Sequence, residues 1–122
     1  MRTVALVILN ALALMQSTTA HAETLRWKCD YRSYVSPTGL AAEKFSLDLV
    51  LDTTTKKAVI VGNHGKSDVA VVSGNQAITF PETLESGAVQ TTTITKNGSS
   101  VHSRHTIGLG KLTPAQYYGT CK

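Results

Sequence analysis

Residues 88–107 read AVQTTTITKNGSSVHSRHTI, and they indicate an all-β fold. Two β-favouring runs flank Asn97-Gly98, and Asn-Gly between such runs is the strongest short-range signal for a hairpin with a type I′ turn. Because side chains alternate along a strand, such a two-residue turn also determines which residues share a face. The expected pairs on one face are Ile94 with Val101, Thr92 with Ser103, Gln90 with His105, and Ala88 with Ile107.

The rest of the chain repeats this pattern of short alternating runs. Residues 25–35 and 45–51 alternate apolar with polar side chains, and turn-forming residues separate the runs. Eight such strands without helical periodicity predict a single antiparallel meander. We expect it to close into a small barrel, with a two-sheet β-sandwich as the alternative.

The two cysteines, Cys29 and Cys121, lie near opposite ends of the mature chain. No Cys-x-x-Cys motif is present, and neither cysteine has metal ligands beside it, so a structural disulfide is expected in an oxidising compartment. Closing a loop of about 90 residues contributes roughly 4–5 kcal/mol in the chain-entropy model. The bond would place the first and last strands side by side, which favours the barrel.

The start of the chain predicts export. Arg2, an apolar run over residues 4–14 and the small-x-small ending at Ala22 are typical of a cleaved signal peptide. We therefore assign residues 1–22 to the signal and residues 23–122 to a single β domain of a periplasmic or secreted protein. The apolar run is too short to span a bilayer.

The charge of the mature chain excludes a dedicated nucleic-acid binder. Lys plus Arg number 12 and Asp plus Glu 8, so removing Arg2 leaves 11 − 8 = +3. This mild excess is compatible with an acidic partner but falls short of what nucleic-acid binding typically requires.

The histidines do not indicate a metal site or a catalytic centre. His102 and His105 are three residues apart, and on a strand this spacing directs them to opposite faces. Ser103 and His105 share a face, but no acidic residue of the hairpin could orient the imidazole. We therefore expect no enzyme, no metal and no cofactor.

Two binding hypotheses remain, one for each face of the hairpin. The expected inner face carries Gln90, Thr92, Ser103 and His105, which either form an internal hydrogen-bond network or line the pocket of a small-ligand carrier. The expected outer face is basic, and we favour it as a binding surface for an anionic envelope component or an acidic protein. Its residues are Arg26, Lys28, Arg32, His102 and Arg104.

The two ends of the chain carry a resemblance. Residues 103–107 and 112–121, together with Trp27-Lys-Cys29, resemble small exported bacterial proteins whose function is not established. That resemblance implies a disulfide-closed β-barrel without implying an activity. A looser resemblance is to the periplasmic lysozyme inhibitors, which are also small exported barrels. Their Ser-Gly-rich inhibitory loop has no counterpart here, and a basic chain complements a basic enzyme poorly.

Overall fold

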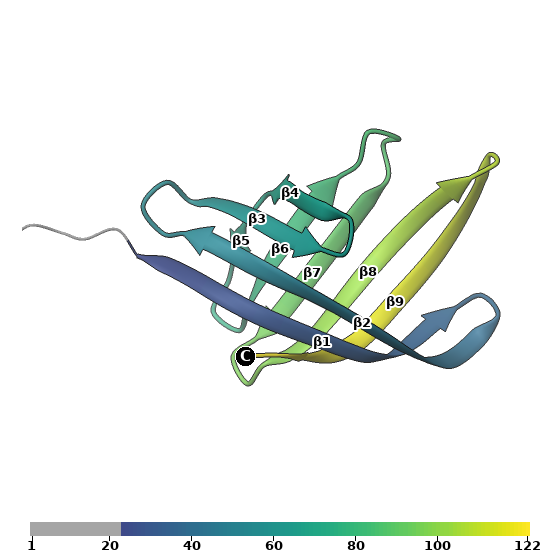
Figure 1. Ribbon diagram of the computed structural model, residues 1–122, viewed down its shortest axis with the longest axis horizontal. Helices are drawn as coiled ribbons and strands as arrows, with labels where there is room; N and C mark the ends of the chain where they lie inside the picture. Colours follow the sequence, from purple (N-terminus) through teal and green to yellow (C-terminus); the bar gives the residue numbers. More distant parts are fainter. Residues whose placement is uncertain (1–22) are drawn as a thin grey trace, which may run out of the picture.

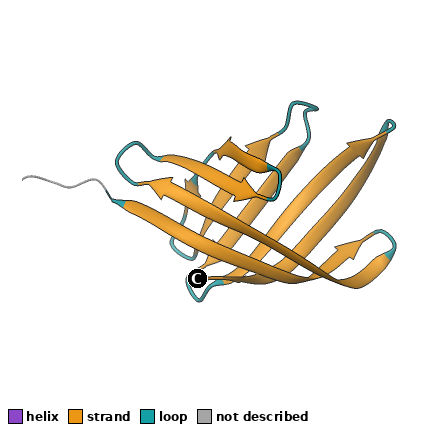
Figure 2. Ribbon diagram, viewed as in Figure 1, coloured by secondary structure: helices purple, strands orange, loops and turns teal. Residues whose placement is uncertain are grey.

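The computed structural model describes residues 23–122, so the predicted signal peptide lies outside the described residues. Residues 23–122 form strands and loops only, as Figure 2 shows. The strands are β1 (Thr24–Ser36), β2 (Gly39–Asp52), β3 (Lys57–Gly62), β4 (Gly65–Val69), β5 (Val72–Ser73), β6 (Ala77–Thr83), β7 (Val89–Thr95), β8 (Ser99–Gly108) and β9 (Lys111–Cys121).

All nine strands belong to one antiparallel sheet, in the order β4-β3-β2-β1-β9-β8-β7-β6-β5. The sheet curls into a half-barrel with a concave and a convex face (Figure 1). The prediction of an all-β meander is confirmed, and the strands form one sheet rather than the two sheets of a sandwich.

The two ends of this sheet are parts of one continuous segment, residues 65–73. Its first half pairs with β3 and its second half with β6, and between them the Ala70 N–H donates to the Pro81 carbonyl oxygen at 2.8 Å. The segment changes partner midway, and this explains why eight runs in the sequence become nine strands. It also links the two ends of the curled sheet.

The disulfide prediction is confirmed. Cys29 of β1 and Cys121 of β9 are direct cross-strand partners with Cα atoms 4.0 Å apart, and their sulfurs are bonded. The neighbouring pair, Lys28 and Lys122, exchanges two backbone hydrogen bonds of 2.9 and 3.0 Å. The first and last strands are therefore neighbours, as expected.

The concave face holds the core. Its largest fully buried side chains include Tyr31, Leu49 and Phe80, and Trp27 packs edge-on against Phe80 with ring centroids 5.5 Å apart. The Tyr31 hydroxyl is 2.8 Å from Ser100 Oγ, so its polar end has a partner inside the core. The buried core comprises Cys29, Tyr31, Leu47, Leu49, Leu51, Ala58, Phe80, Ile94, Tyr117 and Cys121.

The predicted register of the β7–β8 hairpin is wrong by one residue. In the structure Ile94 pairs with Ser100, Thr92 with His102, and Gln90 with Arg104. Since side chains alternate with period two, this slip moves every β8 side chain to the other face relative to β7. His102 and Arg104 therefore lie on the concave face, whereas Ser103 and His105 lie on the convex one.

The cause is a turn of three residues rather than two. The Gly98 N–H donates to the Thr95 carbonyl at 3.0 Å, and Gly98 adopts φ 92° while Asn97 keeps a negative φ. A type I′ turn would need positive φ at both positions. The Gly98 carbonyl also accepts a hydrogen bond from Cys121 N–H at 2.7 Å, so the turn is joined to the end of β9.

Candidate functional site

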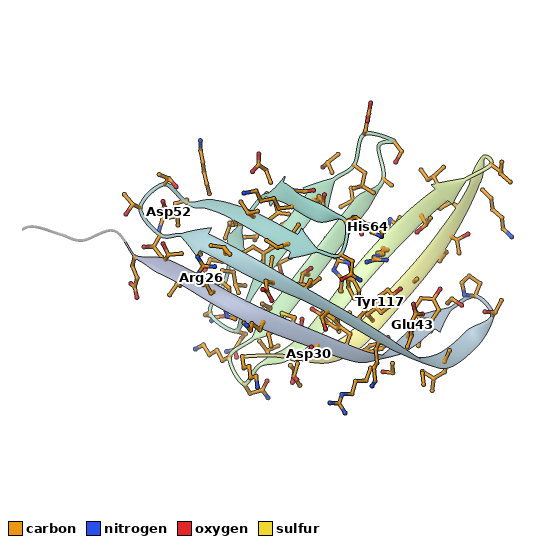
Figure 3. All side chains as sticks on the ribbon, viewed as in Figure 1. Arg26, Asp30, Glu43, Asp52, His64 and Tyr117 are labelled. Carbon is orange, nitrogen blue, oxygen red and sulfur yellow. A yellow bond between two sulfur atoms is a disulfide. The ribbon has the colours of Figure 1, made fainter. Side chains whose placement is uncertain are left out.

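The concave face opens into a pocket of about 460 Å³ beyond the packed core. Its lining includes four charged side chains from three strands: Glu43 and Lys44 of β2, Glu82 of β6 and Arg104 of β8. Figure 3 labels Glu43, His64 and Tyr117, which line the pocket from β2, the β3–β4 turn and β9. The volume is within the range of small-molecule sites.

Arg104 lies over two aromatic rings of the pocket. Its Cζ atom is 4.5 Å from the ring centroid of Phe45 and 5.0 Å from that of Tyr117. The two rings are neighbours themselves, with centroids 4.9 Å apart. Phe45 and Tyr117 come from strands far apart in sequence, and β1 lies between those strands in the sheet. Cation–π attraction to both rings holds the guanidinium in place.

A hydrogen bond to His102 also holds the guanidinium of Arg104 in place. Arg104 Nε–H donates to His102 Nε2 at 3.2 Å, so this nitrogen carries no proton. The proton of the neutral ring is therefore on Nδ1, which donates to Thr92 Oγ1 at 2.7 Å. His102 is 2% exposed. Burial, and then the charge of Arg104, lower the pKa of His102 from 6.5 to about 4.

The charge of Arg104 is not neutralised by a carboxylate within residues 23–122. Its one side-chain hydrogen bond to this part of the chain goes to His102, and no carboxylate oxygen lies within 4.0 Å of its nitrogens. The two terminal nitrogens of the guanidinium are thus without a charged partner beside an open pocket. An arginine in this state is prepared to bind an anion.

The two glutamates of the pocket have neutral partners. Gln90 Nε2 donates to Glu82 Oε1 at 3.3 Å, and the Tyr117 hydroxyl donates to Glu43 Oε1 at 3.5 Å. Burial raises the pKa of the Tyr117 hydroxyl, which keeps it protonated as a donor. The carboxylates therefore remain able to accept further hydrogen bonds from a ligand.

Of the four residues predicted for an interior site, two are on the concave face. Gln90 lines the pocket, and Thr92 lies beneath it, 1% exposed, as the partner of His102. The placement of Ser103 and His105 in the interior is wrong, because Ser103 pairs with Thr91 on the convex face and His105 is exposed.

Of the five residues predicted for the basic outer face, three lie on the convex face. Arg26, Lys28 and Arg32 are exposed there, and Lys28 and Arg32 border a groove of about 350 Å³ together with Lys122. The assignment of His102 and Arg104 to this face is wrong for the reason given by the hairpin register. The one-residue error in the predicted register thus exchanged Ser103 and His105 with His102 and Arg104 between the two predicted sites.

Sequence reasoning missed the aromatic and acidic lining of the pocket. Phe45 and Tyr117 alternate with their neighbours like ordinary core residues, and nothing local distinguishes them from Leu47 or Cys121. Glu43 lies two residues before Phe45 on the same face of β2, but β2 begins at Gly39, ahead of the alternating run 45–51 from which the strand was expected. The β-bulge formed by Glu43 and Lys44 opposite Arg32 leaves no clear sequence signal.

Among residues 23–122, no three His, Cys, Asp or Glu side chains gather where they could share a metal ion. His102 and His105 lie on opposite faces of β8, one buried and one exposed. The described part of the chain also has no helix that could cross a bilayer.

Comparison with protein-family models, curated proteins and solved structures finds no match for this chain. The resemblances to small exported bacterial proteins and to lysozyme inhibitors therefore stay predictions.

Proposed function

We propose that this chain is an exported, non-enzymatic binding module that holds a small carboxylate ligand in the concave pocket, with Arg104 as its anchor. The observation that carries the proposal is the state of the guanidinium. It lies over Phe45 and Tyr117, is fixed by neutral His102, and has no carboxylate partner within residues 23–122.

The carboxylate follows from the shape of the guanidinium. Arginine presents its N–H groups in a planar fork that matches the two oxygens of a carboxylate. With Nε–H engaged by His102, the edge formed by the two terminal nitrogens is left for such a bidentate contact. Because the rings and His102 already hold the side chain, little further side-chain entropy is lost on binding.

Binding fits the pocket better than catalysis. The buried imidazole uses both nitrogens, one toward Arg104 and one toward Thr92, so it has no free nitrogen for proton transfer. Both cysteines are in the disulfide. The Ser103–His105 pair lies on the convex face, away from the pocket.

The test is an NMR titration of the backbone amides with benzoate and with benzamide, which has the same shape but no charge. We expect benzoate to shift the amides around Phe45, Gln90 and Tyr117 and to bind at least tenfold tighter than benzamide. Arg104→Gln should remove this preference, and the matched control Arg32→Gln on the convex face should retain it.

Arg104→Lys provides a second variant in case the first folds poorly. It keeps the charge but loses the planar fork, so benzoate affinity should fall between wild type and Arg104→Gln. Equal benzoate affinity in wild type and both variants, or shifts restricted to the convex face, would contradict the proposal.

A second candidate function uses the convex face, where the groove bordered by Lys28, Arg32 and Lys122 is basic. Lys28 and Lys122 are paired side by side, while Asp30 is partly engaged by the Ser46 hydroxyl at 2.7 Å. This surface would contact an anionic envelope lipid.

We expect wild type to sediment with vesicles containing phosphatidylglycerol at low salt, and the double variant Lys28→Glu with Arg32→Glu to stay in solution. A wild type that does not sediment would exclude this candidate.

A further inference from the structure

We infer that the ligand of the concave pocket is amphoteric: its carboxylate binds Arg104, and a separate ammonium group binds Glu82. This inference rests on the proposed function and specifies its ligand class. It is based on opposite charges that line the same pocket at separate positions.

Glu82, Gln90 and Arg104 form one row across three adjacent strands. Glu82 pairs with Gln90, and Gln90 pairs with Arg104, so all three project from the concave face at the same level. Adjacent strands are about 4.8 Å apart, which separates the backbones of Glu82 and Arg104 by roughly 10 Å. Gln90 stands between the two charges.

At one end of this row, the Arg104 side chain turns away from Glu82, and its guanidinium lies over the rings of Phe45 and Tyr117, on β2 and β9. At the other end, Glu82 accepts a hydrogen bond from Gln90, the residue between them. The Gln90 amide uses one N–H for this bond. Glu82 thereby keeps acceptor capacity for a positively charged donor.

The formal charges around the pocket balance. Its charged lining residues are two cations, Lys44 and Arg104, and two carboxylates, Glu43 and Glu82, while burial keeps His102 neutral at pH 7. A pocket with separated charges and no net charge is best complemented by a ligand of the same kind. The pocket also has apolar lining from Phe45, Leu47 and Ile60, which suits an uncharged part of the ligand.

Three probes separate the poles in a calorimetric titration. 4-(Aminomethyl)benzoate carries both charges at opposite ends of a rigid ring, benzoate carries only the carboxylate, and benzylamine only the ammonium group. We expect 4-(aminomethyl)benzoate to bind wild type at least tenfold tighter than benzoate, with benzylamine the weakest of the three.

Glu82→Gln should abolish the tenfold advantage of 4-(aminomethyl)benzoate over benzoate. The matched control Glu85→Gln, an exposed residue of the β6–β7 loop, should keep the advantage. Far-UV circular dichroism and thermal melting verify that each variant is folded.

The outcomes separate this inference from the proposed function. Equal binding of 4-(aminomethyl)benzoate and benzoate to wild type would contradict the inference of an amphoteric ligand. It would leave the proposed carboxylate site at Arg104 unaffected. Loss of the advantage in Glu43→Gln instead of Glu82→Gln would overturn the assignment of Glu82. Failure of benzoate itself to bind would refute the proposed function.

Discussion

At the scale of single residues, the contacts of His102 determine its tautomer and its protonation state. Thr92 and Arg104 each contact one ring nitrogen, and this allows only the neutral tautomer with its proton on Nδ1. Protonation would remove the acceptor for Arg104 Nε–H and place two cations side by side in a buried site. The low pKa, about 4, follows from burial first and from Arg104 second.

This pKa has a consequence for stability. Above pH 6.5 both folded and unfolded His102 are neutral; between pH 6.5 and 4 the unfolded chain takes up a proton that the folded chain does not. The free energy of unfolding should therefore fall by roughly 3 kcal/mol as the pH drops through this window, and His102 adds nothing further below it. Urea unfolding at several pH values measures the slope.

The control is His102→Gln, which cannot titrate but can still accept a hydrogen bond from Arg104. Carboxylates contribute to acid sensitivity in both proteins, so the difference in slope between wild type and variant isolates His102. Parallel curves between pH 6.5 and 4 would show that the imidazole is not buried as described.

At the scale of elements, the β7–β8 hairpin shows why strands are easier to predict than registers. Both strands and their connection are where the sequence places them, because alternation and turn residues are local signals. The register depends on the length of the turn, which spans residues 96–98 and whose Gly98 carbonyl bonds Cys121 at the far end of the chain. Local sequence carries no trace of that partner, and so the prediction exchanged His102 and Arg104 with Ser103 and His105.

The β1–β9 pairing depends on a glycine. A Cβ atom on Gly119 would collide with the Asp30 carbonyl oxygen and lie 2.7 Å from Tyr31 Cα, both of which are backbone atoms that cannot rotate away. We expect Gly119→Ala to lower the free energy of unfolding by about 3 kcal/mol.

Gly108→Ala is the matched control, since a Cβ atom there would meet nothing within 4 Å. Its stability should stay within about 0.5 kcal/mol of wild type in the same urea titration. Equal effects of the two substitutions would mean that β1 and β9 do not approach each other as closely as the structure places them.

At the scale of the whole molecule, the disulfide and the 65–73 segment join distant parts of the chain. The cysteine pairing was predictable because two cysteines in a chain that is expected to be exported leave one intramolecular partner each. The pocket of the half-barrel was not predictable, since its lining comes from seven strands and two connecting loops. It depends on a bulge and a register that only the assembled sheet determines.

Removing the disulfide should lower the free energy of unfolding. Cys29 and Cys121 are 92 residues apart in sequence, and a cross-link over this separation stabilises the folded state by about 4–5 kcal/mol in the chain-entropy model. We expect Cys29→Ala with Cys121→Ala to lose an amount of this order in denaturant unfolding under oxidising conditions. A loss below about 1 kcal/mol would indicate that the sheet holds these ends together without the bond.

Placement of His102 and Arg104 together on the concave face underlies both the pocket and its proposed ligand. Long-range ¹H–¹⁵N NMR of the imidazole nitrogens at pH 7 reports the protonation of each ring nitrogen. We expect His102 to show a protonated Nδ1 and a bare Nε2, unchanged until the pH approaches 4. A protonated Nε2, or an imidazole that titrates near pH 6.5, would place His102 in solvent on the convex face and remove the anchor of the site.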